Sequence, residues 1–129
     1  MAYVLANEGV QTVVHRTAGV GAWAAPGYVG WGTGAGTAAT SHTTLFTEAS
    51  ESRVAATVTV ETDILTDDTL QAVGTLTSAS SQTITNAGVF DVSNKTDASD
   101  KMFMKGDFTG IGVDSGDAIQ FTFKWRLNN

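Results

Sequence analysis

The stretch Ala118-Ile-Gln-Phe-Thr-Phe-Lys-Trp-Arg-Leu127 decides the fold class, because large apolar residues alternate with polar ones along its whole length. Successive side chains of a β-strand point to opposite faces, so this pattern predicts a strand with one buried face and one solvated face. The residues expected to face the core are Ile119, Phe121, Phe123, Trp125 and Leu127, opposite Gln120, Thr122, Lys124 and Arg126.

The same alternation recurs upstream. Residues 53–64 place valines on one face and polar residues on the other, and residues 70–77 repeat the pattern after a turn-like Thr-Asp-Asp sequence. Residues 83–90 read as a third strand, in which Gly88 suggests a bulge or a close backbone approach. A polar, solvated loop is expected next, over residues 91–100. Beyond it, Met102, Met104 and Phe108 alternate with Lys101 and Lys105, which puts Phe103 on the polar face.

Five closely spaced strands without helical periodicity predict an all-β fold, an antiparallel β-sandwich or barrel. The first 50 residues are less regular. A strand is expected around Val10–Val14 and another at residues 28–31, followed by a flexible loop at residues 32–41. We therefore expect an irregular N-terminal arm over residues 1–27 and a single β domain over residues 28–129. Such an arm, with few contacts of its own, would be disordered or would pack on a neighbouring subunit.

Composition narrows the function classes. A chain of 129 residues fits one domain with a genuine core, and the absence of cysteine excludes disulfides and thiolate chemistry. The net charge of −6, with seven scattered Lys and Arg residues, argues against nucleic-acid binding. No apolar run approaches the roughly 20 residues that span a bilayer, and the N-terminus lacks the basic region of a secretory signal. We expect a protein assembled in a cytoplasm, without nucleic-acid or membrane partners.

The sequence contains no pattern that predicts chemistry. The segment Gly30-Trp-Gly-Thr-Gly-Ala-Gly36 superficially resembles a phosphate-binding loop, but neither a Lys-Ser/Thr pair nor a helical pattern follows it. His15 and His42 are isolated and are expected at the surface or an interface. Aspartates cluster at turns, which favour Asp on conformational grounds, and a turn-bound calcium ion is the weaker interpretation. We predict no catalytic, cofactor-binding or metal-binding residues and a protein that is not an enzyme.

Aromatic residues are the best candidates for binding, since large aromatic side chains serve cores and interfaces alike. Those of the last strand are expected in the core. Those of the less regular N-terminal part are expected to contact other subunits, or, as a weaker alternative, to stack on a sugar as in a carbohydrate-binding module. The interface candidates are Tyr3, Trp23, Tyr28 and Trp31, of which the last three are also the candidates for sugar stacking.

Four segments resemble parts of small virion proteins of tailed bacteriophages. They are Tyr28-Val-Gly-Trp-Gly-Thr-Gly-Ala-Gly-Thr-Ala-Ala-Thr40, Leu45-Phe-Thr-Glu-Ala-Ser-Glu-Ser-Arg-Val54, Ile84-Thr-Asn-Ala-Gly-Val-Phe-Asp91 and Ser115-Gly-Asp-Ala-Ile-Gln-Phe-Thr-Phe-Lys124. The similarity covers residues 28–127 and extends more faintly to N-terminal modules of tail-collar and tail-fibre proteins. Such relatives often read Ile-Thr-Glu-x-Gly-Leu-Phe-Asp, so Asn86 and Val89 here replace a glutamate and a leucine. If that glutamate makes a structural hydrogen bond, the amide of Asn86 weakens or takes over its role.

The resemblance implies a non-enzymatic virion structural protein without a cofactor. One placement is a capsid decoration or cement protein, which would bind the major capsid protein as a small homo-oligomer, often a trimer, and clamp neighbouring subunits with its N-terminal arm. The rival is a tail-fibre or collar component that binds tail proteins. We favour decoration, because no coiled coil or fibrous repeat follows the β domain.

Overall fold

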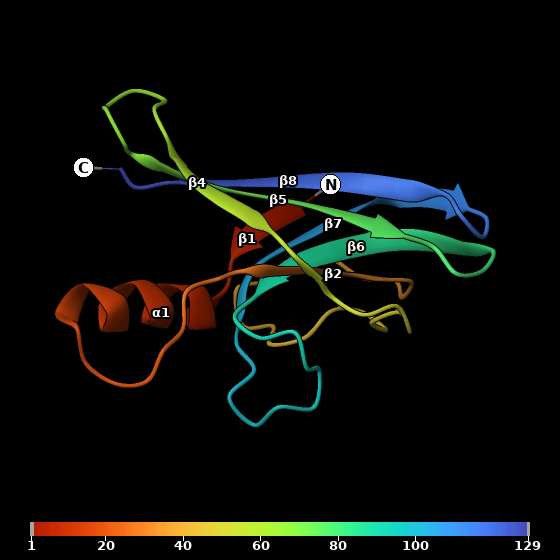
Figure 1. The fold of residues 1–129 in the computed structure, drawn as a ribbon, viewed down its shortest axis with the longest axis horizontal. Helices are drawn as coiled ribbons and strands as arrows, with labels where there is room; N and C mark the ends of the chain where they lie inside the picture. Colours follow the sequence, from red (N-terminus) through yellow and green to blue (C-terminus); the bar gives the residue numbers. More distant parts are fainter. Residues whose placement is uncertain (1, 129) are drawn as a thin grey trace.

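The computed structural model describes residues 2–128, which form eight strands and one helix (Figure 1). The strands build two antiparallel sheets that pack face to face, which confirms the expected all-β sandwich. Sheet A has the strand order β1-β7-β6-β2-β3, and sheet B has the order β4-β5-β8. The elements are β1 (Ala2–Leu5), α1 (Asn7–Ala18), β2 (Tyr28–Gly32), β3 (Val54–Ala55), β4 (Thr57–Glu61), β5 (Thr69–Thr77), β6 (Gln82–Phe90), β7 (Met102–Val113) and β8 (Ala118–Arg126).

Sheet B has the alternation that the sequence predicts, except that Leu127, expected to face the core, lies beyond the end of β8 and is 61% exposed. Directly paired residues share a face of an antiparallel sheet, and Ala72 of β5 lies between Val58 of β4 and Phe123 of β8. Leu76 pairs with Ile119 on the same face and is fully buried. The opposite face of sheet B carries mainly Thr and Gln side chains. One face of sheet B therefore packs on the core and the other faces solvent.

Sheet A is buried on both faces. On the face toward sheet B, Val29 of β2 pairs with Val89 of β6, and both are fully buried. On the other face, Gly88 of β6 pairs with Lys105 of β7, whose side chain is also buried. The prediction that Phe103 and Lys105 lie on a solvated face is therefore wrong, since both side chains are covered.

The irregularity predicted at Gly88 is confirmed. The pairing of β6 with β7 shifts register between Ile84 and Asn86 and again next to Val89. A Cβ atom at Gly88 would lie 2.9 Å from the carbonyl oxygen of Met104, closer than real contacts allow. Glycine is needed here because the neighbouring strand leaves no room for a side chain.

A helix replaces the strand expected around Val10–Val14. The valines of α1 follow the i, i+3, i+4 spacing of a helical face, with acidic Glu8 in the first turn and basic Arg16 in the last. Gly19, in a left-handed conformation with φ of 68°, ends the helix. Within the described part of the chain, no helix is long and apolar enough to cross a membrane.

The N-terminal segment, expected to be an irregular arm with few contacts, packs on its own sandwich. β1 pairs with β7 at the edge of sheet A, and the amide of Ala6 donates a hydrogen bond of 3.0 Å to the carbonyl of Phe103. Behind it, α1 lies against β7 at Gly9, where an added Cβ would clash with the carbonyl oxygen of Phe103. Both elements therefore belong to the same packed body as the sheets.

The contact at Gly9 gives a testable prediction. Replacing a helical glycine with alanine normally stabilises a helix by about 1 kcal/mol. In Gly9→Ala the new methyl group would push α1 away from β7, so we expect the free energy of unfolding to fall by about 1–3 kcal/mol. Urea denaturation followed by tryptophan fluorescence would measure it. Gln11→Ala, at an exposed position of the same helix, is the control, and a stabilised Gly9→Ala protein would contradict the packing.

Candidate functional site

Two irregular loops cover the face of sheet A that points away from sheet B. They comprise residues 33–53 and residues 91–101, and in Figure 1 they lie below the sheet layers. Irregular backbone in a covered position needs hydrogen-bond partners for its N–H and C=O groups. The polar side chains on this face are therefore candidates to supply these partners.

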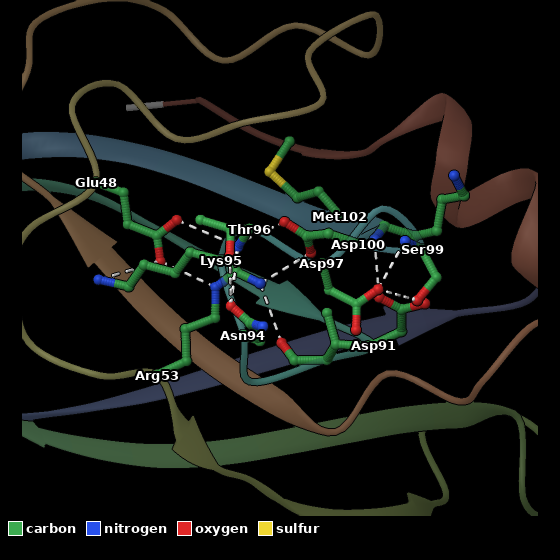
Figure 2. Close-up of polar contacts among 12 residues, drawn as sticks. Glu48, Arg53, Asp91, Asn94, Lys95, Thr96, Asp97, Ser99, Asp100 and Met102 are labelled. Atoms are coloured by element: carbon green, nitrogen blue, oxygen red, sulfur yellow. Dashed lines mark hydrogen bonds and ion pairs between the residues drawn. The ribbon is translucent and has the colours of Figure 1, made fainter.

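Arg53 joins the two loops (Figure 2). Its guanidinium Nε lies 2.9 Å from Glu48 Oε2 and its Nη1 lies 2.8 Å from Asp100 Oδ1, and it donates a further bond of 3.0 Å to the carbonyl of Val92. Its flat face lies 3.5 Å from the ring centroid of Phe90. Burial would lower the pKa of Arg53, but the hydrogen bonds and charges of Glu48 and Asp100 outweigh burial and raise it.

Lys95 makes a second connection between the same loops. Its ammonium donates hydrogen bonds to the carbonyls of Ala49 and Glu51 and lies 3.9 Å from Glu48 Oε2. Asp97 caps its own turn by accepting bonds from the amide and hydroxyl of Ser99. The loop over residues 91–100 is thus largely exposed at its tip, as predicted, but anchored at its base.

Asn86 holds the first loop to sheet A. Its Oδ1 accepts a bond of 3.0 Å from the amide of Phe46, and its Nδ2 donates one of 3.1 Å to the carbonyl of the same residue. The side chain is fully buried, so both bonds satisfy groups that water cannot reach. The amide of Asn86 therefore has a structural hydrogen-bonding role, joining sheet A to the loop.

Lys105 is the second buried anchor of this loop. Its Nζ donates a bond of 2.7 Å to the carbonyl of Thr44, lies 3.2 Å from His42 Nδ1 and sits 3.4 Å from the ring centroid of Phe46. Burial lowers the pKa of Lys105, and the charge of Asp107 opposes that effect. The loop at residues 32–41, expected to be flexible, is itself held by hydrogen bonds of 2.9 Å from the amide of Gly34 to the carbonyl of Phe46 and from the amide of Ala38 to Asp107 Oδ1.

These polar groups hold the two loops in place. Each buried charged or amide side chain described above is bonded to loop backbone or to an ion-pair partner. Among residues 2–128, no three His, Asp or Glu side chains are grouped so that they could hold a metal ion.

The four aromatic interface candidates lie in different environments. Trp31 is only 1% exposed, donates its indole N–H to Glu51 and packs edge-on against Phe121, so it belongs to the core and is withdrawn as an interface residue. Trp23 is half-buried and stacks on His15 at 4.5 Å. Tyr28, on β2, is also half-buried, whereas Tyr3 is 68% exposed. With Trp31 buried, Trp23 and Tyr28 remain as the candidates for sugar stacking.

Tyr3 borders an apolar pocket that sequence reasoning missed. In sheet A, β1 lies outside β7 at the edge of the sheet, so Tyr3 is 68% exposed, whereas Phe108 packs on a phenylalanine of β8. The space, about 410 Å³, is lined by those two residues together with Phe121, Phe123 and Lys124. We call it the edge pocket, and its volume falls in the range of roughly 300–1,000 Å³ typical of ligand sites.

A second apolar surface lies at the opposite edge of sheet B. Val58 and Val60 point to the core side of β4, yet they are exposed, and Val60 is 65% exposed. The turn that follows, residues 62–68, adds Ile64 at 72% and Leu65 at 50% exposure. We call this turn the tip; Figure 1 shows it projecting beyond both sheets. Large apolar side chains gathered in this way on a surface mark interaction sites.

Some of these features had a signal in the sequence. The alternation of residues 54–60 assigns Val58 and Val60 to the core side, but it cannot show that sheet A ends before covering them. A lone arginine next to a strand, as Arg53 is in the sequence, gives no reason to expect burial. Searches against protein-family models, curated proteins and solved structures found no match to this chain.

The Arg53 network predicts a large loss of stability on substitution. Arg53→Met would leave Asp100 without its cation, and Glu48 with only the more distant Lys95, in a mostly covered site, so we expect the free energy of unfolding to fall by about 3 kcal/mol. Hydrogen exchange of residues 91–101 should also become faster. Arg126→Met is the matched control, because its ion pair with Asp63 is solvent-exposed and worth about 1 kcal/mol or less. Equal losses for both variants would refute the network.

The lowered pKa of Lys105 predicts a pH effect. Between this lowered pKa and the ordinary lysine value of about 10.4, the unfolded chain binds the proton more tightly than the folded protein. Folding stability contributed by Lys105 therefore rises as the pH increases through this window. The free energy of unfolding of the wild type, minus that of Lys105→Met, should increase with pH. Denaturant titrations between pH 7 and pH 10.5 would measure it, with Lys124→Met as control for loss of one lysine, and a decrease would contradict burial of the charge.

Proposed function

We propose that this chain is a structural protein of a tailed-bacteriophage particle that decorates the capsid by binding the major capsid protein. The observation that supports a binding role is the placement of its side chains. Buried charged groups such as Arg53 and Lys105 hold loop backbone, whereas large apolar groups remain exposed at two edges of the sandwich. This combination suits a rigid protein that contacts other proteins.

The resemblance of four segments to virion proteins supports the phage assignment. In the folded chain these segments contact one another: β2 pairs with β6, and Asn86 in one segment holds Phe46 in another. Three of the four segments thus lie in sheet A and its covering loop, and the fourth, residues 115–124, lies mainly in β8 of sheet B. Because these residues build the fold, a shared pattern at their positions supports a common origin. It gives less information about where in the particle the protein lies.

The capsid contact no longer requires a free N-terminal arm. The clamp hypothesis assumed a segment with few contacts of its own, but β1 pairs with β7 and α1 packs on the same strand. The proposal therefore assigns the capsid contact to exposed edges of the folded sandwich. Residues such as Tyr3 are available for it without unfolding any part of the described chain.

Localisation in the particle tests the proposal. Cryo-electron microscopy of purified particles of the phage that encodes this chain should show density for the sandwich distributed over the icosahedral shell. Immunogold labelling with an antibody against the purified protein should decorate heads. Label confined to the tail would replace decoration with the tail-fibre or collar role, and absence of the protein from purified particles would overturn a virion function altogether.

A further inference from the structure

We propose that this chain binds further copies of itself head to tail, with the tip of one copy inserted into the edge pocket of the next. The pocket lies beside β8 at one edge of sheet B, and the tip is the turn that joins β4 to β5 at the end of these strands. Both surfaces expose apolar side chains. In a head-to-tail arrangement one neighbour covers the tip of a copy and another neighbour covers its pocket.

The tip is rigid enough to act as an insert. The carboxylate of Asp68 accepts three backbone hydrogen bonds, from the amides of Asp63, Ile64 and Leu65 at 2.9, 3.1 and 3.0 Å. These bonds fix the turn while Ile64 and Leu65 point their side chains into solvent. Because the turn is already ordered, its insertion would lose little conformational entropy.

The edge pocket has the chemistry to receive it. Phe108, Phe121 and Phe123 provide an aromatic lining, and Tyr3 stands at the rim. Phe108 already packs on Phe121 of β8, whereas Tyr3 is 68% exposed, so the open side of the pocket lies beside Tyr3. The branched side chains of Ile64 and Leu65 supply an apolar contact there from outside, and aromatic pockets of this kind concentrate binding energy.

Charge selects a second copy's pocket as the partner of the tip. Two acidic residues, Asp63 and Asp67, flank the apolar pair of the tip; Asp63 pairs with Arg126 at 3.2 Å, whereas Asp67 forms none of the ion pairs found among residues 2–128. Two tips facing each other would bring the Asp67 charges together. The pocket presents Lys124, which also forms none of those ion pairs, next to Asp107, whose carboxylate accepts a hydrogen bond from the amide of Ala38 at 2.9 Å. Tip and pocket therefore match in apolar character, and Lys124 offers a partner for Asp67.

A tip-to-pocket contact uses different surfaces on the two partners. Such heterologous contacts close into a ring when the rotation between copies allows it and otherwise continue as a filament. The purified chain alone should form this contact. Its test is therefore independent of whether the protein is placed on a capsid or on a tail.

Mixing two assembly-deficient variants tests the contact directly. A tip variant, Ile64→Ser/Leu65→Ser, keeps the pocket and keeps the backbone bonds to Asp68. A pocket variant, Tyr3→Glu/Lys124→Glu, keeps the tip and changes only exposed side chains. By light scattering coupled to size exclusion and by sedimentation velocity, the wild type should be oligomeric, and each variant alone should associate at least about 30-fold more weakly. A 1:1 mixture should form a heterodimer, since one intact tip and one intact pocket remain.

The control is Val10→Ser/Val14→Ser, which removes two exposed valines from α1 and should leave assembly unchanged. Circular dichroism should give the same fold for all variants. A wild-type protein that stays monomeric at about 100 µM would overturn the proposal, a concentration at which even a weak, micromolar contact would be visible. A tip variant that assembles like the wild type, or a mixture that remains monomeric, would overturn it equally.

Discussion

The rest of the structure depends on how irregular backbone is held against the outer face of sheet A. Loops that cover a sheet bring N–H and C=O groups into a place that water does not reach, and each such group left without a partner costs about 1–3 kcal/mol. Asn86 and Lys105 supply partners from the sheet itself, and Arg53 supplies them between the loops. Sheet A is therefore packed on both faces although no second sheet or helix layer covers its outer side.

This constraint explains which parts of the fold the sequence predicts. In sheet B one face meets the core and the other meets water, so alternation assigns residues such as Ala72 and Phe123 to the core side correctly. In sheet A both faces are covered, and alternation loses its meaning: Lys105 is as buried as Val89. Burial of Lys105 could be predicted only by knowing its hydrogen-bond partner, the carbonyl of Thr44, which lies 61 residues earlier in the chain. Local patterns carry no information on such pairs.

The helix was missed for a different reason. Val10, Val13 and Val14 are β-branched, and β-branched residues favour strands, but their spacing and the glycine that follows are those of a helix. What stabilises α1 is its contact with β7, where Gly9 permits close approach to the backbone of Phe103. Tertiary packing thus outweighs intrinsic propensity in a segment only 12 residues long.

The two exposed apolar edges follow from the same chain path. The chain crosses from sheet A to sheet B between β3 and β4, which places β4 at the margin of the core, and β1 then widens sheet A at the other margin. Pairing of β1 with β7 anchors α1 and helps to bury Ala6, but it also creates a ledge over which sheet B has no strand. Closing the sandwich with an additional strand would remove the ledge, as barrels do for all their edges. In this chain the five strands of sheet A face only three strands of sheet B, so the edges of the two sheets do not coincide. Apolar side chains of a binding partner would complete the smaller sheet.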